Sequence, residues 1–227
     1  HSFHYLLGSF GLVDKFIFPS FFARNYYIRN SMIAKKKTGV INNFATPGKA
    51  TSKFPYFLYV GRISQEKGIH ELLEVFSSLP EANLIVAGGG ADEQKVGFYR
   101  KFPNIRFLGR LPKEEVYQHL SNALFTIIPS KCLEVAPTVL IESFANSTAV
   151  LTPKLGVFKE LVEEGKTGFL FENFNDLGKK IERLQKRYGL AKKMGTSAFE
   201  RYNKNYTPER HYKRLVDIYE RVTSEKA

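Results

Sequence analysis

Leu124-Phe-Thr-Ile-Ile128 is the stretch that most clearly indicates the fold, because four of its five residues are apolar and do not alternate with polar ones. A short run that is apolar on both faces is typical of a parallel strand with helices packed on each side of the sheet. Leu84-Ile-Val-Ala87 has the same character. From Phe57 onward, such runs alternate with amphipathic helical segments. This alternation predicts an α/β fold with a Rossmann-like doubly wound parallel sheet, followed by C-terminal helices.

The periodicity predicts six strands in this part of the chain, at residues 57–60, 83–87, 105–108, 124–128, 149–151 and 168–171. Helices are predicted between and after them, at residues 68–78, 92–101, 113–122, 139–146, 158–163, 177–187 and 190–205. Thr207-Pro-Glu is typical of a helix start, with Thr207 as N-cap and the proline at the first position. Because ligands of doubly wound sheets bind at the carboxyl ends of the strands, functional residues are expected in the strand-to-helix loops.

The first 45 residues have a different pattern. A buried strand is predicted at 14–20, a helix at 22–32 and a short strand at 39–44. These few elements cannot enclose a hydrophobic core of their own. They are therefore expected to belong to a second domain that is mostly absent. Residues 46–54 have the Thr, Pro, Gly, Lys and Ser content of a linker. The predicted division is residues 1–45 for the remnant, 46–54 for the linker, 55–206 for the main domain and 207–227 for a C-terminal helix.

The net charge of +12 is concentrated at the two ends of the chain. Residues 1–54 carry +7 and residues 179–227 carry +8, whereas residues 55–178 carry −3. A basic chain suggests nucleic acid as a partner. The single cysteine excludes zinc-finger spacing, however, and the sequence has no aromatic-rich RNA-binding signature and no dense basic helix, so no nucleic-acid partner is expected. The basic ends are expected to favour a membrane surface or a phosphate-bearing acceptor.

Three features of the sequence bear on location. No apolar run approaches the ~20 residues that a helix needs to cross a bilayer. The start of the chain lacks the pattern of a signal peptide and is expected to lie in mid-protein. Cys132 is the only cysteine, which excludes an internal disulfide and fits a reducing compartment. A cytoplasmic protein, peripheral to the membrane, is therefore expected.

A cationic loop follows the first of the six predicted strands, in Tyr59-Val-Gly61-Arg62-Ile-Ser-Gln-Glu-Lys67-Gly68. Gly61 allows the backbone to turn, and Arg62 and Lys67 lie five residues apart before a helix. Two cations and a helix N-terminus suit a diphosphate; the alternative is a surface turn with solvated cations. The loop is not a Walker A motif, because Glu66-Lys67 stands where Gly-Lys is required.

A pair of glutamates flanks the helix start after the strand at 124–128. Pro137 is placed to open that helix, which would leave the N–H groups around residues 138–140 free to face an anion. Glu134 lies in the loop before the helix, and Glu142 lies one to two turns into it. One carboxylate can then reach a sugar hydroxyl and the other a ribose hydroxyl. The alternative is that each is an ordinary solvated charge.

Taken in order, these motifs resemble those of the family 4 (group 1) glycosyltransferases, whose GT-B fold pairs two Rossmann-like domains across a cleft. The resemblance covers nearly the whole chain. The motifs are Val13-Asp14-Lys-Phe-Ile-Phe-Pro-Ser20, Val40-Ile-Asn-Asn-Phe44, Gly61-Arg62…Lys67-Gly68, Ala87-Gly-Gly-Gly90, Arg106-Phe-Leu-Gly109-Arg110-Leu111, Glu134-x7-Glu142 and Phe158-x-Glu160-Leu-Val-x-x-Gly165-x-Thr167-Gly168. It implies that residues 55–206 are the donor-binding half of a GT-B fold and that residues 1–45 are a remnant of the N-terminal acceptor domain.

The resemblance also implies roles for individual residues. Arg62 and Lys67 would bind the donor diphosphate beside Gly61, Glu134 would contact donor sugar hydroxyls, and Glu142 would contact the ribose. The remaining implied donor contacts are the backbone of Val135, Ala136, Pro137, Thr138 and Val139 along the sugar and phosphates, and the loop of Arg110 and Leu111 beside the nucleobase. Val135-Ala136 stands where many members have Gly-Phe or Gly-Gly, so the hexose contacts are expected to differ.

The implied reaction is retaining transfer of a hexose from a nucleoside-diphosphate sugar to a glycan or lipid-linked acceptor, with Arg62, Lys67 and Glu134 as catalytic residues and no cofactor. The four aspartates are never two residues apart, so the Asp-x-Asp motif of metal-dependent transferases is absent. Arg62 and Lys67 are therefore expected to stabilise the leaving phosphate without a metal. The alternatives are a non-catalytic nucleotide-sugar-binding subunit and a GT-B-like sugar-nucleotide epimerase; glycoside hydrolysis is disfavoured because it leaves the cationic loop without a role.

Overall fold

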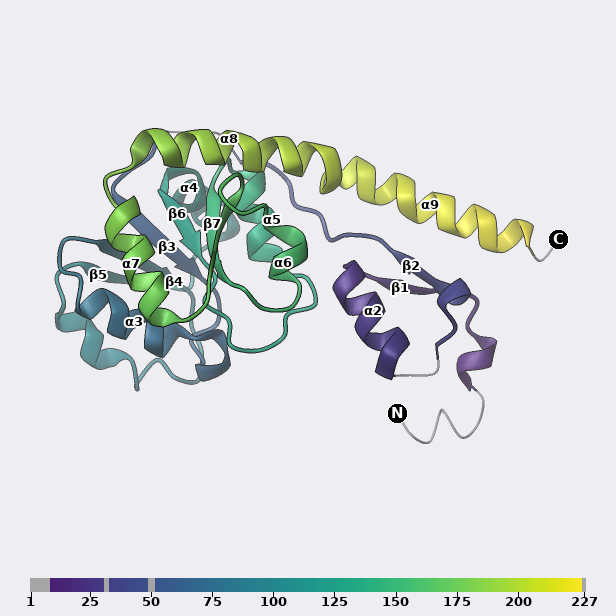
Figure 1. Ribbon diagram of the computed structural model, residues 1–227, viewed down its shortest axis with the longest axis horizontal. Helices are drawn as coiled ribbons and strands as arrows, with labels where there is room; N and C mark the ends of the chain where they lie inside the picture. The colour runs from purple at the N-terminus through teal and green to yellow at the C-terminus, as the bar shows by residue number, and fades with distance from the viewer. Residues whose placement is uncertain (1–8, 31–32, 49–51, 226–227) are drawn as a thin grey trace.

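The computed structural model describes residues 9–30, 33–48 and 52–225, and its largest part is a parallel sheet of six strands flanked by helices (Figure 1). The strands are β3 (Tyr56–Val60), β4 (Asn83–Ala87), β5 (Ile105–Gly109), β6 (Phe125–Ile127), β7 (Ala149–Pro153) and β8 (Gly168–Phe171). They lie in the order β5-β4-β3-β6-β7-β8, and all neighbours are parallel. From β3 the chain adds β4 and β5 toward one edge of the sheet. It then returns to the other side of β3 and adds β6, β7 and β8 toward the opposite edge, as in a doubly wound sheet. The predicted α/β class is confirmed.

Helices cover both faces of this sheet. They are α3 (Ile69–Ser77), α4 (Lys113–Asn122), α5 (Thr138–Ala145), α6 (Phe158–Leu161), α7 (Phe174–Leu184) and α8 (Tyr188–Asn205). Phe57 of β3 packs in one core with α3 and α7, whereas the next residue, Leu58, packs against Leu120 of α4 on the other face. Adjacent strand residues point to opposite faces, so a strand with helices on both sides is apolar throughout.

The predicted helix at 92–101 is wrong. Residues 91–96 form turns, and only η4 (Gly97–Lys101) is helical, as a 3-10 segment. The residues that pack into the core, Val96, Tyr99 and Phe102, are three apart. That spacing suits the three residues per turn of a 3-10 helix, and Gly97 weakens an α-helix at this place.

The N-terminal segment forms a small unit of its own beside the main sheet. It contains η1 (Ser9–Leu12), β1 (Phe16–Phe18), α2 (Phe21–Asn30), η2 (Lys35–Lys37) and β2 (Thr38–Val40). β1 and β2 pair in parallel, with Phe16 opposite Thr38. The predicted strand at 39–44 is therefore shorter and starts earlier, and the last two residues of the helix predicted at 22–32 lie outside the described residues.

The last helix, α9 (Pro208–Ser224), returns to this N-terminal unit. Thr207 is its N-cap, as predicted: the side-chain oxygen accepts the Arg210 N–H at 3.3 Å. α9 runs on from α8 beyond the six-stranded sheet and lies beside β1 and β2 (Figure 1). His211 Nδ1 donates to the Asn42 carbonyl at 2.8 Å, and Arg214 donates to the Asn42 side chain at 2.9 Å. The two basic ends of the chain are therefore brought side by side.

Across residues 9–30, 33–48 and 52–225, no helix combines the length and the apolar character that a membrane crossing requires.

Candidate functional site

A pocket of about 410 Å³ lies where the carboxyl ends of β3 and β6 meet. These are the two strands at which the chain reverses its direction across the sheet, so the loops that follow them diverge and leave a crevice. The pocket brings together most of the predicted site residues: Gly61, Arg62, Lys67, Glu134, Ala136, Pro137, Thr138, Val139 and Glu142. Residues about 80 apart in the sequence thus line one pocket.

Glycines allow the loops around the pocket to approach closely. Gly68 ends η3 (Gln65–Lys67) in the left-handed conformation, with φ of 70°, and a Cβ there would collide with the Pro129 carbonyl. Gly88 has φ of 141°, and a Cβ there would collide with the Gly61 carbonyl. Only glycine combines a positive φ with the absence of a Cβ atom, as both positions require. The Gly-Gly-Gly turn after β4 therefore supports the cationic loop from behind.

Lys67 and Glu134 are joined across the pocket. Lys67 Nζ lies 2.5 Å from Glu134 Oε1, and Ser130 Oγ donates to the same oxygen at 2.6 Å. The side chains of Lys67 and Glu134 are 24% and 15% exposed, so this charge-assisted bond is largely shielded from water. It ties the loop after β3 to the loop after β6.

Arg62, by contrast, points into solvent, with 71% of its side chain exposed. Its nearest anionic partner is Glu66, at 3.6 Å, and an exposed pair of this kind holds a side chain weakly. The backbone beneath it is fixed, because the Tyr59 hydroxyl donates to the Arg62 carbonyl at 2.5 Å. Burial raises the Tyr59 pKa, which keeps that hydroxyl protonated. The Arg62 backbone is therefore held in place, whereas its side chain is free to turn toward an anion.

The start of α5 supplies backbone donors to the same pocket. Pro137 is the N-cap, in extended conformation, and the helix begins at Thr138, one residue before the predicted range of 139–146. The Leu140 N–H donates to the Pro137 carbonyl at 3.2 Å, so the expectation of a free N–H at 140 is wrong. Within the described part of the chain, the N–H groups of Thr138 and Val139 have no hydrogen-bond partner. Two unpaired donors at a helix N-terminus suit an anion.

Glu142 is the fifth of the eight residues of α5, and it also lines the pocket. Burial raises the pKa of its carboxyl group, and the positive charge of Lys113 on α4 opposes that shift. A half-buried carboxylate that stays close to a cation is a suitable acceptor for a neutral hydroxyl group.

Three predicted donor contacts lie outside the pocket. The Val135 side chain is exposed. Arg110 lies at the carboxyl end of β5, where its Nε would be 2.8 Å from a Cβ added at Gly89. Arg110 and Leu111 therefore lie on the same edge of the sheet but two strands away from β3. Whether they border a nucleobase stays a prediction.

Among the pocket residues that were not predicted, Tyr59 and Ser130 carry the polar side chains. Tyr59 is a polar aromatic residue next to the carboxyl end of a strand that is expected to be core, and its hydroxyl fixes the Arg62 backbone. Ser130 directly follows Pro129 at a strand end and lies four residues before Glu134. A serine in the loop after a central strand is a signal that would have identified it.

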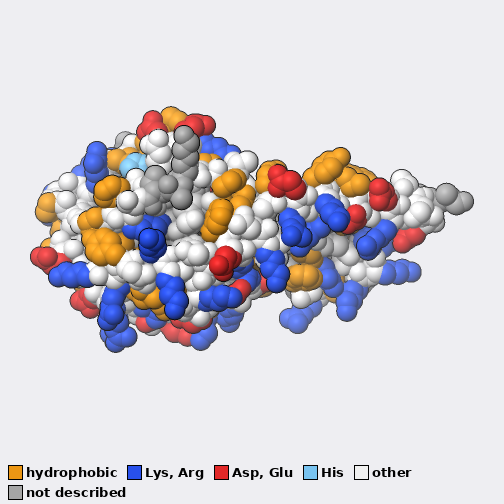
Figure 2. Space-filling model, turned by 90° about the horizontal axis from the view of Figure 1, so that it is seen from above, with side chains coloured by type: hydrophobic (Ala, Val, Ile, Leu, Met, Phe, Trp, Pro, Cys, Tyr) orange, Lys and Arg blue, Asp and Glu red, His pale blue; other side chains and the backbone are white. Residues whose placement is uncertain are grey.

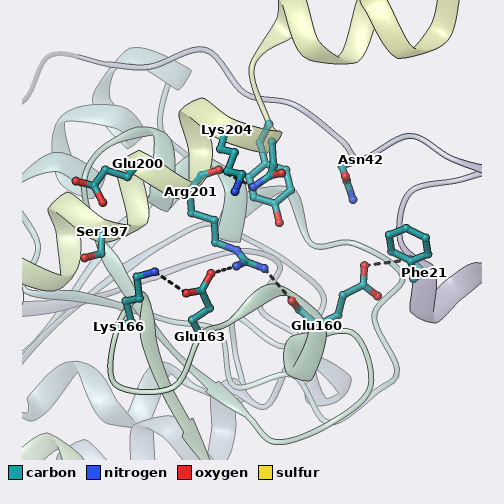
Figure 3. Close-up of a pocket in the computed structure, with 11 residues that line it drawn as sticks. Phe21, Asn42, Glu160, Glu163, Lys166, Ser197, Glu200, Arg201 and Lys204 are labelled. Atoms are coloured by element: carbon teal, nitrogen blue, oxygen red, sulfur yellow. Dashed lines mark hydrogen bonds and ion pairs between the residues drawn. The ribbon is translucent and has the colours of Figure 1, made fainter. Parts of the chain in front are cut away.

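A second pocket, of about 420 Å³, lies between α8, the loop after α6 and the N-terminal segment. Figure 3 shows Glu163 between Lys166 and Arg201, and Glu160 directed toward Phe21. Arg201 also donates to the Glu160 carbonyl at 3.0 Å. The Glu163 carboxylate is thus paired with two cations, and Glu160 links the N-terminal segment to α8 through its carboxylate and its carbonyl.

The chain is similar to known proteins. The family model described as glycosyl transferases group 1 matches residues 41–201. An uncharacterized glycosyltransferase of Methanocaldococcus jannaschii is 27% identical over 175 residues, which are 75% of this chain and 49% of that protein. Trehalose synthase of Pyrococcus horikoshii is 25% identical over 179 residues, 72% of this chain and 43% of that protein. The chain thus spans about half the length of the curated relatives it matches.

Solved structures show the same fold. Sucrose-phosphate synthase of Thermosynechococcus elongatus superposes with a TM-score of 0.81 at 22% identity, over 97% of this chain and 62% of that one. Anabaena HepE, solved in complex with UDP and glucose, superposes with a TM-score of 0.81 at 17% identity, over 91% of this chain and 63% of that one.

Proposed function

Because this chain belongs to the group 1 glycosyltransferases, we propose that it is the donor-binding part of a retaining enzyme that transfers a hexose from a nucleoside-diphosphate sugar. The observation that carries the proposal is the pocket between β3 and β6. Arg62, Lys67, Thr138 and Val139 line it together with two glutamates. Cations and backbone donors suit a diphosphate, and carboxylates suit the hydroxyl groups on either side of it.

The proposed binding mode follows the pocket from end to end. The diphosphate lies between Arg62, Lys67 and the start of α5. Glu142, on the buried side, accepts a hydrogen bond from the ribose, and Glu134 accepts one from the hexose. The nucleobase extends toward Arg110 and Leu111 on the same edge of the sheet. Anabaena HepE, whose structure is described in complex with UDP-glucose, supports this class of ligand.

The proposed chemistry concerns the leaving group. As the glycosidic bond breaks, negative charge grows on the β-phosphate and must be stabilised. Lys67 exchanges Glu134 for that phosphate, and Arg62 turns in from solvent, so the protein provides two cations in place of a metal. Glu134, released from Lys67, holds the sugar hydroxyls and is not a covalent nucleophile. The acceptor, a glycan or a lipid-linked sugar, attacks the face of the hexose from which the leaving group departs.

Calorimetry with UDP, GDP, ADP and their glucose esters tests donor binding by this chain. Binding of one nucleotide sugar, with loss of binding in Arg62→Ala and Lys67→Ala, is the expected result. Turnover by the full-length protein then supports the transferase. Binding without turnover favours a non-catalytic subunit, release of a free epimerised donor favours an epimerase, and no binding by any probe overturns the proposal.

The proposed metal independence has its own test. Transfer by the full-length enzyme is measured with EDTA and again with added magnesium. Equal rates are expected, because Arg62, Lys67 and the α5 N-terminus act on the leaving phosphate. A rate abolished by EDTA and restored by magnesium would contradict it.

A cytoplasmic enzyme that meets its acceptor at an anionic membrane surface is proposed from the two basic ends. Figure 2 shows Lys and Arg side chains distributed over the part of the molecule around α9, with acidic groups among them. Lys15, Arg214 and Arg221, from the two ends, line one pocket together with Asp217 and Glu225. Such a surface attracts anionic headgroups or a lipid-linked phosphate. Sedimentation with anionic but not neutral vesicles at low salt is expected; equal sedimentation would refute it.

A further inference from the structure

Two residues of the N-terminal segment hold the loop between β6 and α5 from outside the pocket. Ser20 Oγ donates a hydrogen bond of 2.6 Å to the carbonyl oxygen of Val135. Asn43 Nδ2 donates one of 3.1 Å to the carbonyl oxygen of Ala136. These bonds span 115 and 93 residues of sequence. Their acceptors are the carbonyl groups of the two residues that directly follow Glu134.

The two bonds determine which side of the loop backbone faces the pocket. In a trans peptide the C=O and N–H groups point in opposite directions. Because the Val135 carbonyl is directed to Ser20, the Ala136 N–H of the same peptide is directed away from Ser20, and Ala136 lines the pocket. With Asn43 binding the next carbonyl, neither oxygen is turned toward the place proposed for the donor. A carbonyl oxygen there would repel the phosphate and sugar oxygens.

Ser20 is itself fixed by bonds that do not involve this loop. It is fully buried, and its Oγ accepts the Ala23 N–H at 3.0 Å, which makes it the N-cap of α2. The Glu160 carboxylate accepts the N–H groups of Phe21 at 3.0 Å and Phe22 at 2.7 Å. The start of α2 is thereby attached to the six-stranded domain through α6. A rigid anchor of this kind can impose a geometry on the loop.

We infer that Ser20 and Asn43 are positioning residues of the donor site. By holding the carbonyls of Val135 and Ala136, they orient the backbone that carries Glu134 against the donor hexose. The N-terminal segment is thereby a structural part of the donor pocket. This inference rests on the proposed function. Arg62 and Lys67 lie in the loop after β3, and Glu142 lies within α5. Loosening the loop is therefore expected to weaken binding of the hexose more than binding of the nucleoside diphosphate.

The test compares each nucleoside diphosphate with its glucose ester by calorimetry on this chain. In Asn43→Ala and Ser20→Ala, the ratio of the two affinities is expected to fall by about fivefold, the effect of one lost hydrogen bond. Ser20→Thr keeps the hydroxyl and is expected to restore the wild-type ratio. Asn42→Ala is the matched control: Asn42 donates to the Pro19 carbonyl and accepts from Arg214, within the same segment but away from the loop.

Each outcome decides the inference. A lowered ratio in Asn43→Ala and Ser20→Ala, with the wild-type ratio in Ser20→Thr and Asn42→Ala, supports it. An unchanged ratio in the first two variants overturns it and leaves the proposed function standing. Equal losses for both probes, together with a lowered melting temperature, assign the two bonds to stability alone and also overturn it. If Ser20→Ala does not fold without its helix cap, Asn43→Ala decides. Wild-type protein that binds none of the probes overturns the proposed function and this inference together.

Discussion

Lys67 Nζ lies 2.5 Å from Glu134 Oε1, so the side chains proposed for the diphosphate and for the hexose hold each other. Donor binding must break this bond and replace it on both sides. Substituting either residue is expected to weaken donor binding, by about tenfold or more for loss of a charged partner. The two substitutions are also expected to be coupled, because each one frees the other residue from its partner.

A double-mutant cycle of Lys67→Met and Glu134→Gln on nucleotide-sugar affinity measures this coupling. The double variant is expected to lose less than the sum of the single losses, by ~0.5–3 kcal/mol, the range found for residues in contact. Lys131→Met is a control lysine in the same loop as Glu134; it pairs with Glu71 instead. Strict additivity of the two losses would show that the pair has no part in donor binding.

The raised pKa of Glu142 predicts a pH dependence of donor affinity. Burial raises the pKa of this carboxyl, so protonation begins at a higher pH than for an exposed glutamate. A protonated carboxyl is a poorer acceptor for a ribose hydroxyl, so affinity is expected to fall as pH is lowered toward that pKa. A nucleotide sugar is the appropriate probe, because it lacks the terminal phosphate ionisation near pH 6.

Two variants separate Glu142 from other titrating groups. Glu142→Gln is expected to bind more weakly at neutral pH and to lose this dependence. Lys113→Met removes the charge that holds the Glu142 pKa down, so the fall in affinity is expected to move to higher pH. Exposed Glu114→Gln, on the same helix as Lys113, serves as control. An affinity profile that is the same in wild type and Glu142→Gln would assign the dependence elsewhere.

The carboxylate of Glu160 is expected to stabilise the joint between the N-terminal segment and the main sheet. Glu160→Ala leaves two N–H groups at the start of α2 without partners, and a loss of about 1–2 kcal/mol in unfolding free energy is expected. Glu160→Gln keeps one acceptor oxygen and should lose less. Urea denaturation measures both. Glu200→Ala, exposed on the rim of the same pocket (Figure 3), is the control; a Glu160→Ala loss no larger than that of Glu200→Ala would contradict the expectation.

The central strands and the site around them could be predicted because their signals are local. A run such as Leu124–Ile128 shows by itself that it is covered on both faces, and the switch point then brings Lys67 and Glu134 to one place. The contacts of Ser20 and Asn43 with the loop after β6 could not be predicted. They cross 93 residues or more of sequence, and no periodicity encodes which carbonyl a distant side chain reaches.

The position of Arg110 shows a second limit. The order of the strands, and therefore the distance between the loops after β3 and β5, depends on connections that the residue pattern does not specify. The helix predicted at 92–101 was wrong for a related reason. The Asp92 N–H donates to the Ile63 carbonyl at 3.1 Å and the Asp92 carboxylate lies 3.1 Å from His70 Nε2, so contacts with the loop after β3 and with α3 determine its conformation. The boundaries predicted for the domains stay predictions.

Lys53, just before β3, is a partly buried cation with no acidic partner among the described residues. Its Nζ donates to the Ser121 carbonyl at 2.9 Å and to Thr148 Oγ1 at 2.5 Å. Both acceptors are neutral, so burial is not offset by a charge and lowers the pKa of Lys53 to about 7. An exposed lysine in the unfolded chain titrates near 10.5.

This difference predicts that stability rises with pH between about 7 and 10.5. In that window the unfolded chain holds the Lys53 proton and the folded protein has released it. The unfolding free energy then increases by up to about 1.4 kcal/mol per pH unit. Below pH 7, Lys53 is protonated in both states, and the folded protein bears the full free-energy cost of burying the charge. Urea denaturation from pH 7.5 to 9.5 should show a steeper rise for wild type than for Lys53→Met, with exposed Lys186→Met following wild type. Parallel curves for all three proteins would mean that Lys53 keeps its proton when folded.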